Sequence, residues 1–484
     1  MNREAVAERT LTWDRGSFRD RANRIYDDGQ TIFRGVNDDV LNNFKKFSDT
    51  ALYETLVGEG KLVRSSVAEA PLGERLSEHW AGFLVHERIP FISYPYEWTF
   101  GMLKDAALLQ LELLERAIPA GWTQKDATAY NIQWRGARPV FIDLPSFEPY
   151  KEGEPWAGYR QFCMMFLYPL MLRAYKGVDY RPMLRSNLEG IEPDIANQIL
   201  SGFTRFRKGV FGHVYLHARM QRRYSSADIS EAKTLTETSG KEVSERRGMR
   251  HSLAMVMGTI QGLASTVRKL SIAEGETTWG DYDKSHSYAK ESFEIKKSFV
   301  AKHAATRRRS LVWDLGCNTG TFSRICAEHS DYVVAADGDE KAVERLYQSL
   351  KSDGVENILP LVMNLANISP NQGWGRRERK AFDSRQKPQL VLCLALIHHI
   401  VISANIPLAE FVRWLRSLDS DVVIEYVGLE DDMVKMLLRN RVNQYGDLAP
   451  EQFEATLASA FNIEDTAPLK GGHRKLYFLT PKQA

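Results

Sequence analysis

The chain has few cysteines, no long apolar run and no marked excess of charge of one sign. Only four of its 484 residues are cysteine and none forms a Cys-x-x-Cys pair, which argues against a zinc site or disulfide framework and fits a reducing cytosol. There are 64 Lys and Arg against 62 Asp and Glu, and this net charge of +2 argues against a protein that mainly coats nucleic acid or an anionic membrane. An apolar fraction of 43% excludes wholesale disorder.

The sequence also lacks a recognisable secretory or membrane-spanning segment. Its first residues, MNREAVAERTLTWDRG, contain no apolar core of the kind found in signal peptides. The most apolar stretches are residues 163–172, which are too short to span a bilayer and contain Pro169, and residues 390–402, which are interrupted by His398 and His399. We therefore expect a cytoplasmic protein with no membrane span.

Three stretches of the chain differ in composition. Residues 1–224 alternate short β-like runs with longer helical ones, and residues 279–484 show a regular α/β pattern. Residues 225–250 are polar and poor in aromatic residues, which is typical of a flexible connector, and a helix is predicted over 253–270. We expect two folded units joined by a linker and connecting helix over 225–278, although length alone suggests roughly three domains.

The first half carries several local predictions. Asp28 and Gly29 tolerate a tight turn, which predicts a hairpin over 24–34. The other elements predicted here are helices over 37–47, 97–118 and 156–175 and short strands over 62–64, 83–86 and 139–143.

The clearest signal lies between residues 311 and 337. An apolar strand (311–315) is followed by a turn with Gly316 and Gly320 and then by a helix (321–329). Such a turn lets a ligand approach the backbone and points the first helical N–H groups toward it. A second strand ends in Asp337, 21 residues after Gly316, where a carboxylate can accept hydrogen bonds from both hydroxyls of a ribose.

Further strands over 358–363, 390–395 and 422–427, with helices between them, predict a parallel sheet covered by helices on both faces. The plainer interpretation is that two glycines and an aspartate form ordinary turns of an α/β protein. The loop reads D-L-G-C-N-T-G and not G-x-G-x-x-G, which disfavours a dehydrogenase.

The second half resembles the class I S-adenosylmethionine-dependent methyltransferases in the segments WDLGCNTGTFS, VVAADGDEKAV, LVMNLAN and LVLCLALIHHI. The resemblance implies a Rossmann-like seven-stranded sheet whose last two strands, over 461–466 and 474–480, are antiparallel. It implies that the glycine loop holds the amino-acid part of S-adenosylmethionine, Asp337 its ribose and Asn364 its adenine, with Tyr288 as a lid. The cofactor-binding residues implied in this way are Asp314, Gly316, Cys317, Asn318, Gly320, Asp337, Gly338, Asn364, Leu365 and Tyr288.

Methyl transfer asks little catalytic chemistry of a protein, because the methyl group of the sulfonium is already activated. A base helps only when the acceptor is a hydroxyl group. His398 and His399 follow the fourth strand, at its ligand-binding end, and Glu425 and Tyr426 lie in the next strand. We take His398, His399 and Glu425 as catalytic candidates, with a structural role as the alternative for each.

Residues 124–148 resemble the catalytic loop of aminoglycoside- and choline-kinase-like enzymes. Asp126, Asn131 and Asp143 have the spacing of a catalytic carboxylate followed by two Mg²⁺ ligands, with Asn131 and Asp143 as the metal-binding pair if Mg-ATP binds. The segment departs from that pattern in its Gln-Lys and Leu-Pro pairs. No glycine-rich phosphate loop precedes it, and Lys61 is the only strand lysine to nominate. We expect an α+β, kinase-like and degenerate first domain; a plain polar turn before a buried strand is the alternative.

Two basic clusters flank the second half: Arg307, Arg308 and Arg309, and Arg376, Arg377, Arg379 and Lys380. A nucleic-acid methyltransferase binds phosphates with such clusters. Because no stacking aromatic residues are interleaved with them, we expect solvated loops.

The order of the two halves resembles that of NoeA-type bacterial methyltransferases of rhizobial nodulation. We therefore expect a methyltransferase whose first domain binds a small-molecule or glycan-like acceptor, methylated at oxygen. The alternatives are a bifunctional kinase-methyltransferase, an RNA methyltransferase and a non-catalytic assembly protein. The acceptor and the oligomeric state stay open.

Overall fold

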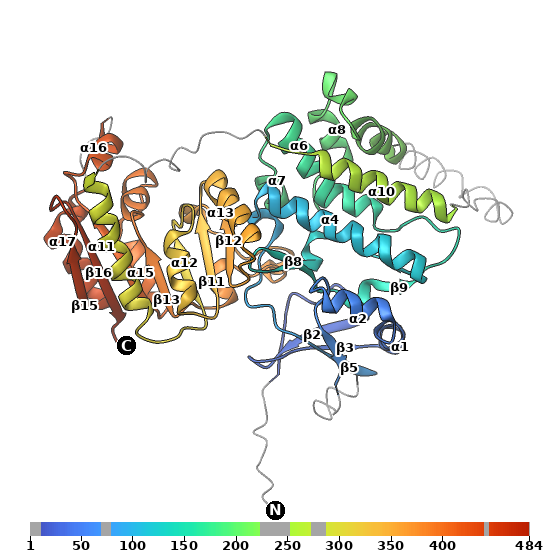
Figure 1. Cartoon of the computed structure of the whole chain (residues 1–484), viewed down its shortest axis with the longest axis horizontal. Helices are drawn as coiled ribbons and strands as arrows, with labels where there is room; N and C mark the ends of the chain where they lie inside the picture. Colours follow the sequence, from blue (N-terminus) through green and yellow to red (C-terminus); the bar gives the residue numbers. More distant parts are fainter. Residues whose placement is uncertain (1–10, 69–78, 223–251, 273–286, 440–444, 484) are drawn as a thin grey trace, which may run out of the picture.

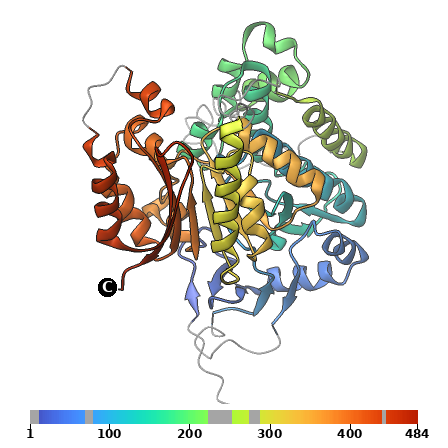
Figure 2. The same ribbon diagram turned by 60° about the vertical axis from the view of Figure 1, so that its left-hand side comes forward.

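The computed structural model describes residues 11–68, 79–222, 252–272, 287–439 and 445–483. Two units lie side by side in it (Figure 1). The first combines a small antiparallel sheet with a group of helices, and the second is built around a seven-stranded sheet. Figure 2 shows helices flanking the larger sheet.

The sheet of the first unit has five strands in the order β1-β2-β3-β5-β4. These strands are β1 (Thr12–Trp13), β2 (Asn23–Asp27), β3 (Ile32–Val36), β4 (Ser65–Val67) and β5 (Gly82–His86). The predicted hairpin is confirmed: β2 and β3 are antiparallel, and Gly29 takes a φ of 89° in the turn between them. The strand predicted over 62–64 is wrong, because that segment forms only an isolated bridge to Phe141 and the strand begins at Ser65.

The helices of the first unit begin at residues that cap them. Asn37 accepts a hydrogen bond from the backbone N–H of Val40 and so opens the predicted helix α1 (Asp38–Ser48). The predicted helix over 97–118 is α4 (Phe100–Ala117), which Thr99 caps. The remaining described helices are α2 (Ala51–Gly58), α5 (Tyr159–Phe162), α6 (Tyr168–Lys176), α7 (Arg181–Ser186), α8 (Pro193–Ile199) and α10 (Leu253–Lys269).

The kinase-like segment contains two small two-stranded sheets. Strand β6 (Trp122–Gln124) pairs with β9 (Phe147–Pro149), and β7 (Ile132–Arg135) pairs with β8 (Arg138–Phe141). Strand β8 ends two residues before Asp143, somewhat earlier than predicted. The helix predicted over 156–175 is continuous in direction but contains a π-helical stretch, Cys163–Leu167, between α5 and α6.

Helix α10 exists as predicted and packs against α4 of the first unit. The ammonium group of Lys104 donates hydrogen bonds to the carbonyl oxygens of Arg268 and Leu270 at its end, at 3.0 and 2.8 Å. This helix therefore adds to the first unit. The polar segment 225–250 lies outside the described residues, and the division of the chain into three parts stays a prediction.

The second unit is a seven-stranded sheet in the order β12-β11-β10-β13-β14-β16-β15. Its strands are β10 (Val312–Leu315), β11 (Val333–Asp337), β12 (Ile358–Val362), β13 (Leu390–Cys393), β14 (Asp421–Val427), β15 (Phe461–Pro468) and β16 (Arg474–Pro481). Strands β10 to β14 are parallel, and β16 is antiparallel to both of its neighbours. The predicted strands and the antiparallel last pair are confirmed.

The helices of this unit alternate with the strands. They are α11 (Ser287–Ala304), α12 (Thr321–Glu328), α13 (Glu340–Asp353), α14 (Phe382–Arg385), α15 (Leu408–Ser417), α16 (Asp432–Leu438) and α17 (Pro450–Ala460). None of the described helices is both long enough and apolar enough to cross a bilayer. All four cysteines are buried and free of disulfide bonds.

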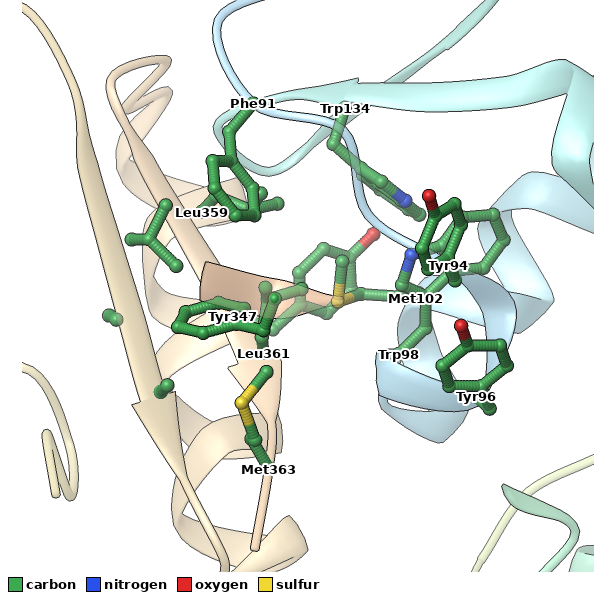
Figure 3. Packing of buried hydrophobic residues seen from close by; sticks show 14 of the residues in the cluster. Phe91, Tyr94, Tyr96, Trp98, Met102, Trp134, Tyr347, Leu359, Leu361 and Met363 are labelled. Carbon is green, nitrogen blue, oxygen red and sulfur yellow. The ribbon is translucent and has the colours of Figure 1, made fainter. Parts of the chain in front are cut away.

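The β12 edge of the large sheet faces the first unit, and buried aromatic rings fill the junction (Figures 1 and 3). Trp134 lies edge-on against Trp98 from its own unit, with ring centroids 5.5 Å apart, and against Tyr347 from α13, at 5.8 Å. Such rings bury large areas and prefer this tilted geometry. The junction is therefore packed like a protein core.

A buried ion pair also joins the two units. Arg385 of α14 donates two hydrogen bonds to Glu97, at 2.6 and 2.7 Å, and the two side chains are only 3% and 1% exposed. The hydroxyl of Ser369 donates to the same carboxylate at 2.5 Å. The guanidinium of Arg385 lies 4.1 Å from the ring centre of Tyr94. A buried ion pair with two hydrogen bonds fixes the relative position of its two side chains, so the first unit is held in one place against the seven-stranded sheet.

Candidate functional site

A cavity of about 1680 Å³ opens at the carboxyl ends of the parallel strands of the large sheet. This is where ligands bind in open α/β sheets. Its walls include nine of the predicted cofactor residues and histidines: Gly316, Cys317, Asn318, Asp337, Gly338, Asn364, Leu365, His398 and His399. The structure therefore brings together residues that the sequence spreads over about eighty positions.

The glycine loop between β10 and α12 has a conformation that side chains resist. Gly316 and Gly320 have φ values of 81° and 82°. A Cβ atom on Gly320 would lie 2.5 Å from Cδ1 of Leu346, so this position has no room for a larger residue. Gly316 faces the cavity and Gly320 does not. The loop thus leaves backbone exposed to a ligand at one glycine and packs tightly against α13 at the other.

Asp337 ends β11 and faces the cavity across the glycine loop. Its two carboxylate oxygens each accept one backbone hydrogen bond, from the N–H of Asn318 at 2.9 Å and from that of Asp339 at 2.8 Å. The backbone N–H of Gly338 adds a further hydrogen bond, and an ionised carboxylate, which has about four acceptor positions, can still accept one from a ligand hydroxyl. Burial raises the pKa of Asp337, and these backbone bonds partly offset that effect.

Asp314 lies beneath the loop and does not line the cavity. Its carboxylate is buried and accepts a hydrogen bond from the hydroxyl of Ser323 at 2.6 Å. Burial raises the pKa of Asp314 to about 7, and the hydrogen bond from Ser323 offsets only part of that shift. The side chain supports the loop from below, and a direct contact with a cofactor stays a prediction.

One side of the cavity is formed by residues that follow β11 and β12. Gly338, Asn364 and Leu365 line it. The Asn364 side chain accepts a hydrogen bond from the N–H of Ala366 at 2.9 Å, which caps a short 3-10 turn. The Tyr288 side chain lies outside the described residues.

The two histidines after β13 differ in burial. His398 is almost completely buried, and burial, followed by repulsion from His399, lowers its pKa to about 3. A base with such a low pKa is a weak proton acceptor near neutral pH. His399 is half-buried, and burial lowers its pKa as well. His399 is therefore the better candidate for a base, and His398 shapes the cavity wall.

Glu425 is fully buried and held by three partners. Lys296 lies 2.8 Å and Arg474 3.2 Å from its two oxygens, and the N–H of Ala395 donates to it at 2.9 Å. Arg474 also binds Asp431 through two hydrogen bonds, at 2.7 and 3.0 Å. We interpret Glu425 as a residue that positions Lys296 and Arg474, because its oxygens are already engaged.

Lys296, Asp431 and Arg474 line the cavity, and sequence reasoning missed all three. Glu425 was the one sequence feature that pointed to charged residues here, because a carboxylate inside an apolar strand needs a charged partner. The sequence does not say which of the chain's 64 basic residues that partner is. The neighbouring residue Tyr426 donates its hydroxyl to the carbonyl of Leu448 at 2.9 Å and acts as a structural residue.

The kinase-like segment brings its three predicted residues together near β3. The amide of Asn131 donates to Asp143 at 3.3 Å, and the negative charge of Asp143 adds to burial in raising the pKa of Asp126. Arg34 occupies the other oxygen of Asp143, at 2.6 Å. Lys61 binds Glu59 and Glu112 instead. Among the described residues, no three His, Cys, Asp or Glu side chains converge as a metal site would require.

Most residues of the two basic clusters are exposed, as expected of solvated loops, but one arginine of each cluster makes a structural contact. Arg309 is buried and pairs with Asp421 at 2.9 Å, and its guanidinium also donates to carbonyl groups at the end of α11. In the second cluster the guanidinium of Arg379 lies 3.8 Å from the ring centre of Tyr130 in the first unit. Both clusters therefore make structural contacts, and the second joins the units.

The sheet order with its reversed strand β16, together with the glycine loop before α12, defines the second unit as a class I S-adenosylmethionine-dependent methyltransferase domain. Over 464 residues, or 96% of this chain and 94% of the relative, the sequence is 34% identical to the nodulation protein NoeA of Rhizobium meliloti (strain 1021). The chain therefore belongs to the NoeA family. No protein-family model matches the chain.

Among solved structures, the chain is similar over part of its length to two methyltransferases. The N-methyltransferase NodS of Bradyrhizobium japonicum WM9, in complex with S-adenosyl-L-homocysteine, matches 43% of this chain and 94% of its own, with 11% identity and a TM-score of 0.32. The magnesium protoporphyrin IX methyltransferase ChlM of Synechocystis PCC 6803, with bound S-adenosylmethionine, matches 43% and 86%, with 16% identity and a TM-score of 0.28. These partial likenesses add nothing to what the sheet order already defines.

Proposed function

We propose that this protein transfers the methyl group of S-adenosylmethionine to a hydroxyl group of a small-molecule or glycan-like acceptor. The observation that carries the proposal is the pairing of the Gly316 loop with the Asp337 carboxylate across one cavity. The class I fold supplies the expectation that these two elements bind the cofactor. The residues around the cavity supply the reasons for the acceptor.

The residues present fit the cofactor. The Asp337 carboxylate faces the cavity and suits the hydroxyls of a ribose, because charge-assisted hydrogen bonds of this kind are strong. Gly316 leaves the loop backbone accessible, and Asn364 and Leu365 form the wall where adenine binds in this class. When bound, the cofactor supplies an activated methyl group on sulfur.

The cavity is large enough for an acceptor as well. Pockets for one small molecule usually measure roughly 300–1,000 Å³, and this cavity holds about 1680 Å³. The cavity wall beyond the glycine loop carries His399, Lys296 and Arg474. These side chains suit an acceptor with several hydroxyl groups, which His399 can orient and deprotonate. Because the acceptor only needs to be held in line with the methyl group, positioning is the main task of this wall.

Methyl transfer to an extract of the source cells tests the proposal. With methyl-labelled cofactor and wild-type protein, we expect label in the small-molecule or glycan fraction. The Gly316→Arg variant should transfer none, because an arginine there projects into the cavity at a φ of 81°. Label in RNA would favour the RNA methyltransferase, and label in no fraction would contradict the proposal.

A matched control separates loss of the site from backbone strain. Gly121 has a similar φ of 84°, is exposed, and has nothing within 4 Å of a Cβ position. Gly121→Arg therefore imposes the same conformational cost far from the cavity. It should transfer label as the wild type does.

We further propose that the first unit is a kinase-like domain that no longer transfers phosphate and instead serves acceptor binding. The support is the Arg34–Asp143 ion pair, which places a protein cation against the carboxylate that would hold Mg²⁺. We expect no thermal shift of the wild type with Mg-ATP. A shift that disappears in Asp143→Ala would instead favour the bifunctional kinase-methyltransferase.

A further inference from the structure

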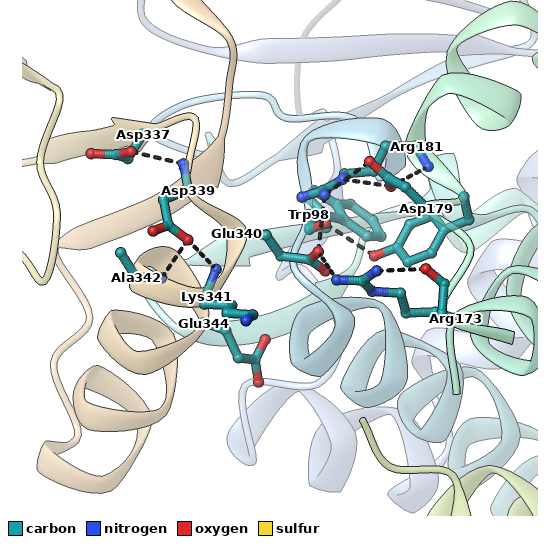
Figure 4. Close-up of polar contacts among 12 residues, drawn as sticks. Trp98, Arg173, Asp179, Arg181, Asp337, Asp339, Glu340, Lys341, Ala342 and Glu344 are labelled. Atoms are coloured by element: carbon teal, nitrogen blue, oxygen red, sulfur yellow. Dashed lines mark hydrogen bonds and ion pairs between the residues drawn. The ribbon is translucent and has the colours of Figure 1, made fainter. Parts of the chain in front are cut away.

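The turn after β11 is the part of the cofactor site closest to the first unit (Figure 4). Asp337, the proposed ribose ligand, accepts a hydrogen bond from the N–H of Asp339. Asp339 in turn caps α13, with its carboxylate accepting from the N–H groups of Lys341 and Ala342 at 2.9 and 3.3 Å. The position of Asp337 is thus tied to the first turn of α13.

The first residue of α13 is Glu340, and its carboxylate is held by the other unit. Arg173 of α6 and Arg181 of α7 bind the same oxygen of Glu340, at 2.5 and 3.0 Å. Arg181 also binds both oxygens of Asp179, at 2.9 and 3.0 Å. We call these four residues the Glu340 cluster: Arg173, Asp179, Arg181 and Glu340.

Burial makes the Glu340 cluster a tight connection. Glu340 is 8% exposed, and the side chains of Arg173 and Arg181 are 21% and 13% exposed. Burial raises the pKa of Glu340, and the charges of Arg181 and Arg173 offset part of that effect. Asp179 is exposed, whereas Glu340 is buried and depends on both arginines, so removing one of them leaves its charge with less compensation. A surface ion pair would lack this property.

The turn after β12, which begins at Asn364, is also connected to α7 of the first unit. Arg185 of α7 donates to the carbonyl oxygens of Asn367 and Ile368, both at 3.0 Å, and to the Asn367 side chain at 3.1 Å. Those residues end the 3-10 turn that Asn364 begins. A separate cavity of about 550 Å³ lies between α7 and the two turns, with Gly338 and Asn364 shared with the larger cavity.

We propose that the first unit is a working part of the cofactor site, in which Arg173 and Arg181 act as positioning residues that hold the Asp337–Glu340 turn in its ligand-binding shape. This inference rests on the proposed function. Holding a loop in its bound conformation reduces the ordering cost of binding. The first unit therefore raises the affinity for the cofactor without touching the methyl group.

Calorimetric titration with S-adenosylhomocysteine tests the proposal on the full chain. We expect Arg181→Met and Glu340→Gln each to weaken binding about 10-fold, because the free turn must then be ordered on binding. The double variant should be no weaker than Glu340→Gln alone, because that change already removes the charge that Arg181 contacts. Arg181→Lys, which keeps the charge, should recover part of the affinity and serves as the test if Arg181→Met does not fold.

Hydrogen exchange gives a readout that a merely stabilising pair would not produce. Without ligand, amides of residues 337–344 should exchange faster in Arg181→Met than in the wild type, while those of the β14–β16 sheet stay unchanged. Arg160 is the matched control, because it pairs with Glu192 at 2.9 Å on the surface of the same unit. Arg160→Met should change neither exchange nor affinity.

The outcomes separate this proposal from the proposed function. If the wild type binds S-adenosylhomocysteine and Arg181→Met and Arg181→Lys bind it equally well, the positioning role is overturned while the proposed function stands. If the wild type does not bind it, the proposed function fails and this inference falls with it. Weakened binding with unchanged exchange at 337–344 also overturns the positioning role.

Discussion

Replacing Asp337 by alanine is expected to lower the affinity for S-adenosylhomocysteine by about a hundredfold or more. Two hydrogen bonds from ribose hydroxyls to an ionised carboxylate contribute about 3–6 kcal/mol together. The alanine variant also loses the acceptors for the N–H groups of Asn318 and Asp339, which loosens the glycine loop and the turn before α13. Calorimetric titration of the two proteins measures the difference.

The control for this variant is Asp353→Ala. Asp353 ends α13, is solvent-exposed and pairs with Arg324 at 2.7 Å. Its removal should leave affinity within about a factor of two. If Asp337→Ala binds as tightly as Asp353→Ala while both remain folded, Asp337 is not a ligand of the ribose.

Replacing Asp314 by asparagine is expected to stabilise the protein above neutral pH. The carboxyl group has an ordinary pKa of 3.8 in an unfolded chain and about 7 in the fold. Above pH 7 the fold must therefore hold a buried anion, at a cost of about 4 kcal/mol that asparagine avoids. The amide oxygen of the introduced asparagine can still accept a hydrogen bond from Ser323. Urea unfolding at pH 8 measures the gain.

The sign of the pH dependence makes this prediction specific. Between about pH 4 and pH 7 the native state keeps a proton on Asp314 that the unfolded state has released, so the free energy of unfolding falls as pH rises through this window. The Asp314→Asn variant lacks that fall. The stability difference should therefore be near zero at pH 4 and largest at pH 8; a difference that does not change with pH would contradict the raised pKa.

If Asp314→Asn stabilises the protein, the buried carboxylates near the glycine loop lower the stability of the fold. Asp314 and Asp337 place two carboxylates near one glycine loop; burial raises the pKa of both, and the charge of Asp337 further raises that of Asp314. Protein sites often accept such a penalty for the sake of a ligand.

The methyltransferase half could be predicted because its signals are local in sequence. Strands β10 and β11 are short apolar runs, and the turns after them carry Gly316 and Asp337 at the positions where ligands reach a parallel sheet. Each of these features depends on neighbours within a few residues. The antiparallel pair β15–β16 was implied only by the resemblance to class I methyltransferases. No local feature of residues 461–480 indicates that β16 pairs with β14.

The junction between the units could not be predicted, because its contacts join residues far apart in sequence. Glu97 and Arg385 are 288 positions apart, and Arg173 and Glu340 are 167 apart. Nothing local marks Glu340 as buried, and in the sequence it reads as an ordinary first-turn residue of a helix. The contact of Arg379 in the second basic cluster could not be predicted for the same reason, since Tyr130, which lies against it, belongs to the other half of the chain.

Titration of the wild-type chain with S-adenosylhomocysteine tests the central claim most directly. We expect saturable binding with one site per chain, and we expect Gly316→Arg to abolish this binding while Gly121→Arg leaves it intact. Absence of binding to a folded wild type would contradict the assignment of the cavity at Gly316 and Asp337 as a cofactor site.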